Sequence, residues 1–102
     1  MADETWEPVI IRYLHEVPVR QWPDGSWDGA AICKAYDTEW EEYWRDPATQ
    51  EFVDVAARSL GMPRDLLVRT VEPGPHEESG MRIHRRIAYD LAGWLRRCGR
   101  LF

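Results

Sequence analysis

The segment Arg85–Arg97, RRIAYDLAGWLRR, constrains the fold more than any other part of the chain. Ile87, Leu91, Trp94 and Leu95 recur at spacings of three and four residues, which places them on one side of a helix. Arginines stand at both ends of the segment. The pattern predicts an amphipathic last helix whose apolar side must be covered by the rest of a small domain.

Two segments near the start of the chain predict a β-hairpin. Residues 9–14 are rich in β-branched side chains, and residues 17–22 predict a second strand that belongs at a sheet edge because of Pro18. The Pro-Asp-Gly sequence at 23–25 is typical of a turn.

Helix signals follow this hairpin. Asp28 stands where a residue should cap a short helix over residues 29–36. The four residues Thr38-Glu39-Trp40-Glu41 fit a capping box. In this motif the Thr38 hydroxyl and the Glu41 carboxylate satisfy backbone amides at the start of another short helix.

The clearest helix boundaries belong to a longer helix. Asp46 is a good cap, Pro47 suits the first helical position, and Gly61 suits a left-handed residue at the end. The apolar stripe between them consists of Thr49, Phe52, Val53, Ala56 and Leu60.

A second hairpin is expected after this helix. A single turn over residues 63–67 leads into a strand near Val68–Val71, and residues 81–84 predict a short returning strand. Residues 72–80, EPGPHEESG, predict a mobile loop or a hairpin tip.

The predicted fold class is α+β, in one small domain. We expect an N-terminal β-hairpin, central short helices, a second hairpin and a C-terminal amphipathic helix. Residues 1–8 are expected to be a flexible N-terminus, and residues 9–102 to form the domain. A chain of 102 residues has room for one modest core.

Charge is distributed very unevenly along the chain. Residues 81–102 contain six arginines and one aspartate, a net charge of +5, whereas the whole chain carries −5. Residues 1–80 therefore carry −10, from seven basic and seventeen acidic side chains. A positive field concentrated in an acidic protein suggests an acidic partner.

No pattern of catalytic or metal-binding residues stands out. The sequence contains no P-loop, no Gly-x-Gly-x-x-Gly and no Gly-x-Ser-x-Gly. His76 begins a His-Glu-Glu run, but a metalloprotease would need a second histidine where Gly80 stands. His84 is expected to cap the last helix or to form a hydrogen bond in the core. We therefore expect no enzyme, metal or cofactor.

Cysteine usage and the N-terminal sequence predict a cytoplasmic protein. Cys33 and Cys98 are the only cysteines, and each falls at an apolar helix position, which predicts buried free thiols. The N-terminus lacks the features of a secretory signal, and no run of 18 apolar residues would span a membrane.

A long central run, DGAAICKAYDTEWEEYWRDPATQEFVDVAARSLGMPRDLL, is followed by Gly-x-x-x-His and then by IAYDLAGWL. In these segments the sequence resembles the KilA-N domain of phage, large DNA viruses and some bacteria, which is related to the fungal APSES DNA-binding domain. The resemblance spans roughly residues 9–98. The matching positions are Gly25 or Gly29, Ala31, Cys33, Lys34, Ala35, Trp40, Tyr43, Arg45, Thr49, Gln50, Phe52, Gly61, Pro63, Leu66, Gly80, His84, Ala88, Leu91, Ala92, Trp94 and Leu95.

The resemblance implies an α+β domain that binds duplex DNA with a winged-helix-like arrangement. The chain departs from the family where basic residues usually precede the aromatic helix, because Asp37, Thr38 and Glu39 stand there. Arg82 replaces a tryptophan before the family's histidine, and Arg85 replaces a proline after it.

The leading prediction is therefore a non-catalytic DNA-binding protein of phage or bacterial type. The candidate nucleic-acid-binding residues are Lys34, Arg45, Arg82, Arg85 and Arg86. The three arginines at the end of the chain, Arg96, Arg97 and Arg100, are explained better by the dipole of the last helix and by solvation.

The acidic run at residues 37–46 leaves an alternative open. Its carboxylates favour helix N-termini and solubility. The alternative is that they form the surface of a protein-binding module on the same fold, such as a phage-encoded inhibitor of a host or defence complex that binds a host protein.

Overall fold

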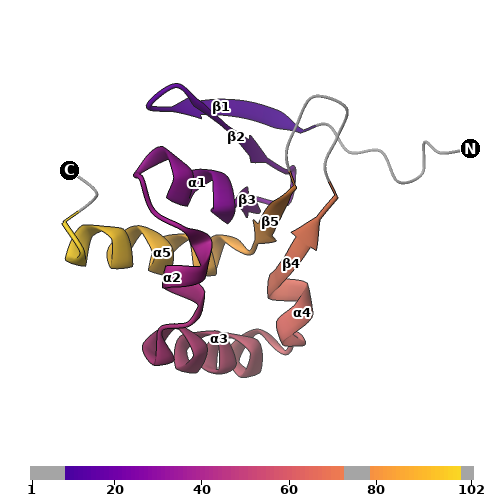
Figure 1. Ribbon diagram of the computed structural model, residues 1–102. Coiled ribbons are helices and arrows are strands. Elements are labelled where there is room, and N and C mark those ends of the chain that lie inside the picture. Colours follow the sequence, from indigo (N-terminus) through magenta and orange to yellow (C-terminus); the bar gives the residue numbers. More distant parts are fainter. Residues whose placement is uncertain (1–8, 73–78, 100–102) are drawn as a thin grey trace, which may run out of the picture.

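The computed structural model describes residues 9–72 and 79–99 and contains one antiparallel sheet with helices packed against it (Figure 1). The strand order is β1-β2-β3-β5-β4, so β1 and β4 form the two edges, and the prediction that the strand containing Pro18 lies at an edge is wrong. The strands are β1 (Ile10–Leu14), β2 (Val17–Gln21), β3 (Trp27–Asp28), β4 (Val68–Val71) and β5 (Gly80–Ile83). The expected flexible segment at 1–8 and most of the loop predicted at 72–80 lie outside the described residues.

Five helices complete the α+β fold, as the sequence predicts. They are α1 (Gly29–Ala35), α2 (Trp40–Trp44), α3 (Pro47–Leu60), α4 (Arg64–Leu67) and α5 (Arg85–Arg97). Helix α1 packs against β2 and β5, and α3 lies at the end of the molecule away from the β1–β2 hairpin, with α2 between them (Figure 1). No described helix is long and apolar enough to cross a membrane.

Most of the expected helix caps are present. The Asp28 carboxylate accepts a hydrogen bond from the Ala31 amide at 3.2 Å and the Asp46 carboxylate one from the Ala48 amide at 3.0 Å. Gly61 ends α3 with a left-handed φ of 66°.

The predicted capping box is wrong by one residue. Glu39, not Thr38, is the cap of α2, and its amide donates to the Glu42 carboxylate at 3.4 Å. The Thr38 hydroxyl instead donates to the Tyr36 carbonyl at 3.0 Å. Asp37 has a φ of 56°, which turns the chain before the helix begins.

The core lies where the apolar side of α5 meets the sheet and α1–α3. Ile87 and Leu91 are completely buried, as the helix periodicity predicts. Polar atoms on the same helix are paired: the Tyr43 hydroxyl donates to Asp90 at 2.7 Å, and the Trp94 indole donates to Asp46 at 3.1 Å.

The two cysteines have different environments. Cys33 is buried in the core, as predicted, and burial, with further contributions from nearby carboxylates, raises the pKa of its thiol to about 12. Cys98 is exposed, so the prediction of a second buried thiol is wrong. The reason is that α5 ends at Arg97, and Cys98 is its C-terminal cap at the protein surface.

Candidate nucleic-acid interface

Trp22, the residue directly after β2, contacts two arginines. The Arg20 guanidinium is 5.6 Å from the centre of the indole ring and the Arg82 guanidinium is 4.8 Å from it. Trp22 is itself buried, so both contacts form in a partly desolvated environment, where cation–π attraction is strongest. The indole therefore fixes the position of Arg82 on β5.

Arg20, one of the two arginines that contact the Trp22 ring, also forms a buried ion pair. The Arg20 guanidinium is 3.1 Å from the Asp28 carboxylate, which also caps α1 and accepts a hydrogen bond from the Met81 amide at 3.1 Å. The carboxylate passes directly over Gly80, where an added Cβ would lie 2.6 Å from Asp28 Oδ1. One carboxylate thus joins β2, β5 and α1.

Arg82 is held by a second carboxylate as well as by the indole. Its Nη2 atom is 3.1 Å from the Asp24 carboxylate in the turn after β2, and its side chain is only 13% exposed. Burial alone would raise the pKa of Asp24, but hydrogen bonds from Ser26 and the Arg82 charge outweigh that effect and lower it. Arg82 is therefore a rigid, partly neutralised cation.

Arg85 and Arg86 occupy the first turn of α5 and are exposed. The Arg85 side chain passes the Pro-Asp-Gly turn, 3.7 Å from where a Cβ on Gly25 would lie. Arg86 Nη1 is 3.4 Å from the Ser59 hydroxyl at the end of α3. Two cations at a helix N-terminus repel the positive end of the helix dipole, so this position favours a negatively charged ligand.

His84 caps α5, as the sequence predicts. Its Nδ1 atom accepts a hydrogen bond from the Arg86 amide at 3.0 Å. Burial lowers the pKa of His84, and the charges of Arg85 and Arg86 lower it further. The cap is thus an imidazole rather than a carboxylate, and the first turn of α5 contains no acidic side chain.

Arg69 joins these cations from the neighbouring strand. It is the register partner of Arg82 in the β4–β5 pair, and directly opposed residues in an antiparallel sheet point to the same face. Arg69, Arg82, Arg85 and Arg86 together form what we call the basic corner. Sequence reasoning missed Arg69, because only the register of the hairpin places it beside Arg82.

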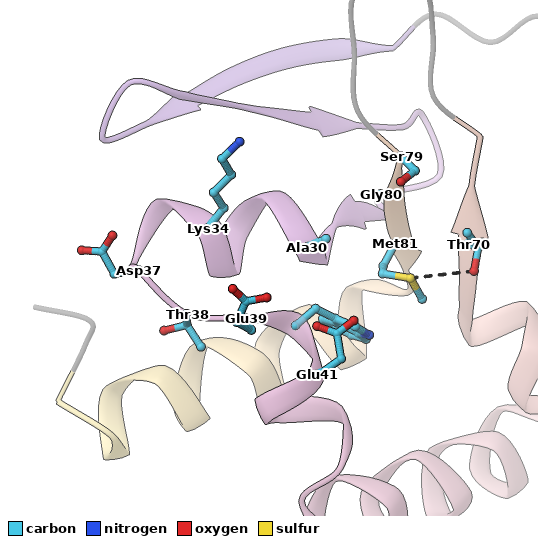
Figure 2. A pocket seen from close by; sticks show the side chains of 11 residues that line it. Ala30, Lys34, Asp37, Thr38, Glu39, Glu41, Thr70, Ser79, Gly80 and Met81 are labelled. Carbon is cyan, nitrogen blue, oxygen red and sulfur yellow. Dashed lines mark hydrogen bonds between the residues drawn. The ribbon is translucent and has the colours of Figure 1, made fainter.

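Lys34 and Arg45 are not part of the basic corner. Lys34 lines a hollow of about 590 Å³ between α1, α2 and the β4–β5 hairpin, together with Asp37, Glu39 and Glu41 (Figure 2). Arg85 and Arg86 line a different hollow, beside Phe52 on α3. Arg45 is exposed at the end of α2. Lys34 and Arg45, which the sequence analysis also names as candidate nucleic-acid-binding residues, therefore stay outside the set that we call the basic corner.

No family model matches the chain, and no curated protein or solved structure matches it significantly. The resemblance to the KilA-N domain therefore stays a prediction. The described residues contain no cluster of histidine, cysteine and acidic side chains that could hold a metal ion.

Proposed function

We propose that this protein is a non-catalytic binding domain that contacts duplex DNA through the basic corner. The observation that carries the proposal is that Arg82, which lies beside Arg69 in the strand register, precedes the exposed Arg85 and Arg86 of the first turn of α5 by only three and four residues. Affinity for duplex DNA comes mainly from neutralised phosphates, and a fixed group of cations provides that neutralisation even on an acidic protein.

The corner combines rigid and adaptable cations. Asp24 and Trp22 hold Arg82 in place, so it contributes a fixed partial charge. Arg85 and Arg86 are exposed and can reach phosphates on either side of it. The resemblance to the KilA-N domain supports the same ligand, with an order of hairpins and helices that agrees with the expected one.

Fluorescence anisotropy with two short duplexes of unrelated sequence tests the proposal. The double variant Arg85→Ala/Arg86→Ala should bind both duplexes about tenfold or more weakly, and the slope of log affinity against log salt should fall by about two. A loss of this kind, equal for both sequences, identifies phosphate contacts.

The matched control lies on the same helix. Arg96→Ala/Arg97→Ala removes two exposed arginines at the other end of α5, about 17 Å away along a helix that rises about 1.5 Å per residue. We expect unchanged affinity for this control and for Lys34→Ala. An equal loss in both double variants would mean that only overall charge matters, and the basic corner would have to be abandoned.

The hollow lined by Lys34 and three carboxylates, which we call the acidic hollow, supports a second candidate function, a protein-binding module. Asp37, Glu39 and Glu41 line one concave surface of the size of a ligand pocket, next to Lys34 (Figure 2). Such a surface repels DNA and attracts a basic protein. This candidate predicts no duplex binding at low salt, together with retention of a host protein that is lost in Asp37→Asn/Glu41→Gln.

A further inference from the structure

The outer edge of β1 is the most apolar exposed surface among the described residues. Seven large apolar side chains are strongly exposed among the described residues, and four of them, Val9, Ile10, Ile11 and Tyr13, lie on or next to this strand. No described strand pairs with its outer side, since β1 ends the sheet. Soluble proteins usually protect such edges with charges, bulges or prolines, and β1 has a single arginine.

The hairpin geometry determines which backbone groups face outward. Strands β1 and β2 are joined by the two-residue turn His15-Glu16, whose φ angles of 49° and 68° are those of a primed turn. The pair that closes such a turn, Leu14 with Val17, exchanges hydrogen bonds, and alternate residues do so along the ladder. The amide and carbonyl groups of Val9, Ile11 and Tyr13 therefore point away from β2.

The outward-facing backbone groups of Val9, Ile11 and Tyr13 can pair with those of the same three residues in a second copy of the chain. When two copies of β1 pair antiparallel about Ile11, Ile11 meets Ile11 of the second copy and Val9 meets Tyr13 of the second copy. Every outward-facing backbone group then has a partner. The side chains of all six residues share one face, because opposed residues in a sheet point the same way.

Charge repulsion disfavours the alternative antiparallel register, which is centred on Arg12. A register centred on Arg12 would place two guanidinium groups directly opposite each other, which destabilises a strand pair. In the register centred on Ile11, Arg12 lies opposite Ile10 of the second copy. Its Nε atom can keep its 2.7 Å hydrogen bond to Gln21 within its own chain.

We propose that a second copy of this chain binds the edge of β1, in the antiparallel register centred on Ile11. The interface joins two sheets into one and does not depend on DNA binding. A contact of two short strands lies at the small end of specific interfaces, so the dimer should be weak, with a Kd on the order of 100 μM.

Sedimentation equilibrium from about 10 μM to 1 mM tests the proposal, with the range set by the expected weak affinity. The wild type should change from monomer to dimer over this range. Ile11→Pro removes an outward-facing amide without removing a β1–β2 hydrogen bond, so it should leave a folded monomer. Ile11→Lys places two charges opposite each other, and each variant should weaken dimerisation at least tenfold. Val55→Lys, which charges an exposed apolar position on α3, is the matched control and should dimerise normally.

Oxidative crosslinking tests the register itself in a Cys98→Ser background, where the remaining Cys33 is buried. Ile11→Cys should form a disulfide-linked dimer, because its Cα lies about 5.5 Å from its counterpart, whereas Arg12→Cys should not. A chain that stays monomeric at 1 mM, a dimer that survives both Ile11 substitutions, or crosslinking at Arg12 in place of Ile11 would each overturn the proposal. Circular dichroism of every variant confirms that the domain is folded.

Discussion

Replacing Gly80 by alanine should destabilise the domain strongly, because the new methyl group would displace the Asp28 carboxylate. The added Cβ would lie 2.6 Å from Asp28 Oδ1 and 2.7 Å from Arg20 Nη2, closer than real Cβ contacts allow. Asp28 and Arg20 are both buried, so neither can move into solvent without separating the pair.

The expected cost follows from what the carboxylate does. Loss of the α1 cap costs about 1 kcal/mol. Loss of the bond from the Met81 amide costs another 0.5–1.5 kcal/mol or so. Separating a buried ion pair costs roughly 3–5 kcal/mol when it is complete. Because part of each contact can persist after a small shift, we expect a loss of about 3 kcal/mol, or roughly 12–24 °C in Tm for a domain of this size.

Urea unfolding followed by tryptophan fluorescence measures this loss directly. Gly93→Ala is the matched control: it lies inside α5, where an added Cβ meets only Arg97 Nη1 at 3.5 Å, so alanine should stabilise the helix by about 0.5–1 kcal/mol. A loss below about 1 kcal/mol in Gly80→Ala would show that the ion pair relaxes freely and that the carboxylate does not hold β2, β5 and α1 together.

Two further predictions concern other polar contacts. Tyr43→Phe should cost about 1.5–2 kcal/mol in urea unfolding, because it removes the bond from a fully buried hydroxyl to Asp90, whereas Tyr89→Phe, at an exposed position, should change nothing. His84 has a lowered pKa in the folded state, so the unfolded chain binds the proton more readily, and stability should fall as the pH drops below about 6.5. Thermal unfolding of His84→Asn from pH 7.5 to pH 5 should lack this component, and an unchanged pH profile would contradict the assignment.

Features of the fold that depend on adjacent residues could be predicted from the sequence. Helix α3 begins at Pro47 after an Asp46 cap and ends before Gly61, as its local signals indicate. The buried side of α5 follows from its periodicity. In both helices the determining residues lie within a few turns of each other.

Features that depend on distant residues could not be predicted. The two-residue strand β3 pairs with β2 through Trp27 alone, and both of its residues pair with β5, more than fifty residues later. The cap of α2 is Glu39 and not the predicted Thr38. The preceding Asp37 adopts a left-handed conformation that the sequence does not require.

The candidate site shows the same division. Arg85 and Arg86 could be placed at the start of the last helix because they are part of its pattern. Their surroundings could not, since Trp22, Asp24 and Arg69 reach Arg82 through the sheet register and the turn after β2. The position of Lys34 beside the carboxylates of Asp37, Glu39 and Glu41 also depends on the fold, so its charge alone did not indicate it.

The cap of α5 offers a way to separate stability from binding. An aspartate is a good helix cap, and beside Arg85 and Arg86 it would also remove the repulsion between their charges and the helix dipole. His84→Asp should therefore raise the free energy of unfolding by about 0.5–1 kcal/mol. If the basic corner binds phosphates, the same substitution should weaken duplex binding several-fold, because it adds a negative charge to the corner. A variant that is more stable and binds DNA less well would mean that the neutral cap keeps the corner positive at a cost in stability. A variant that is more stable and binds equally well would place the DNA contacts elsewhere on the protein.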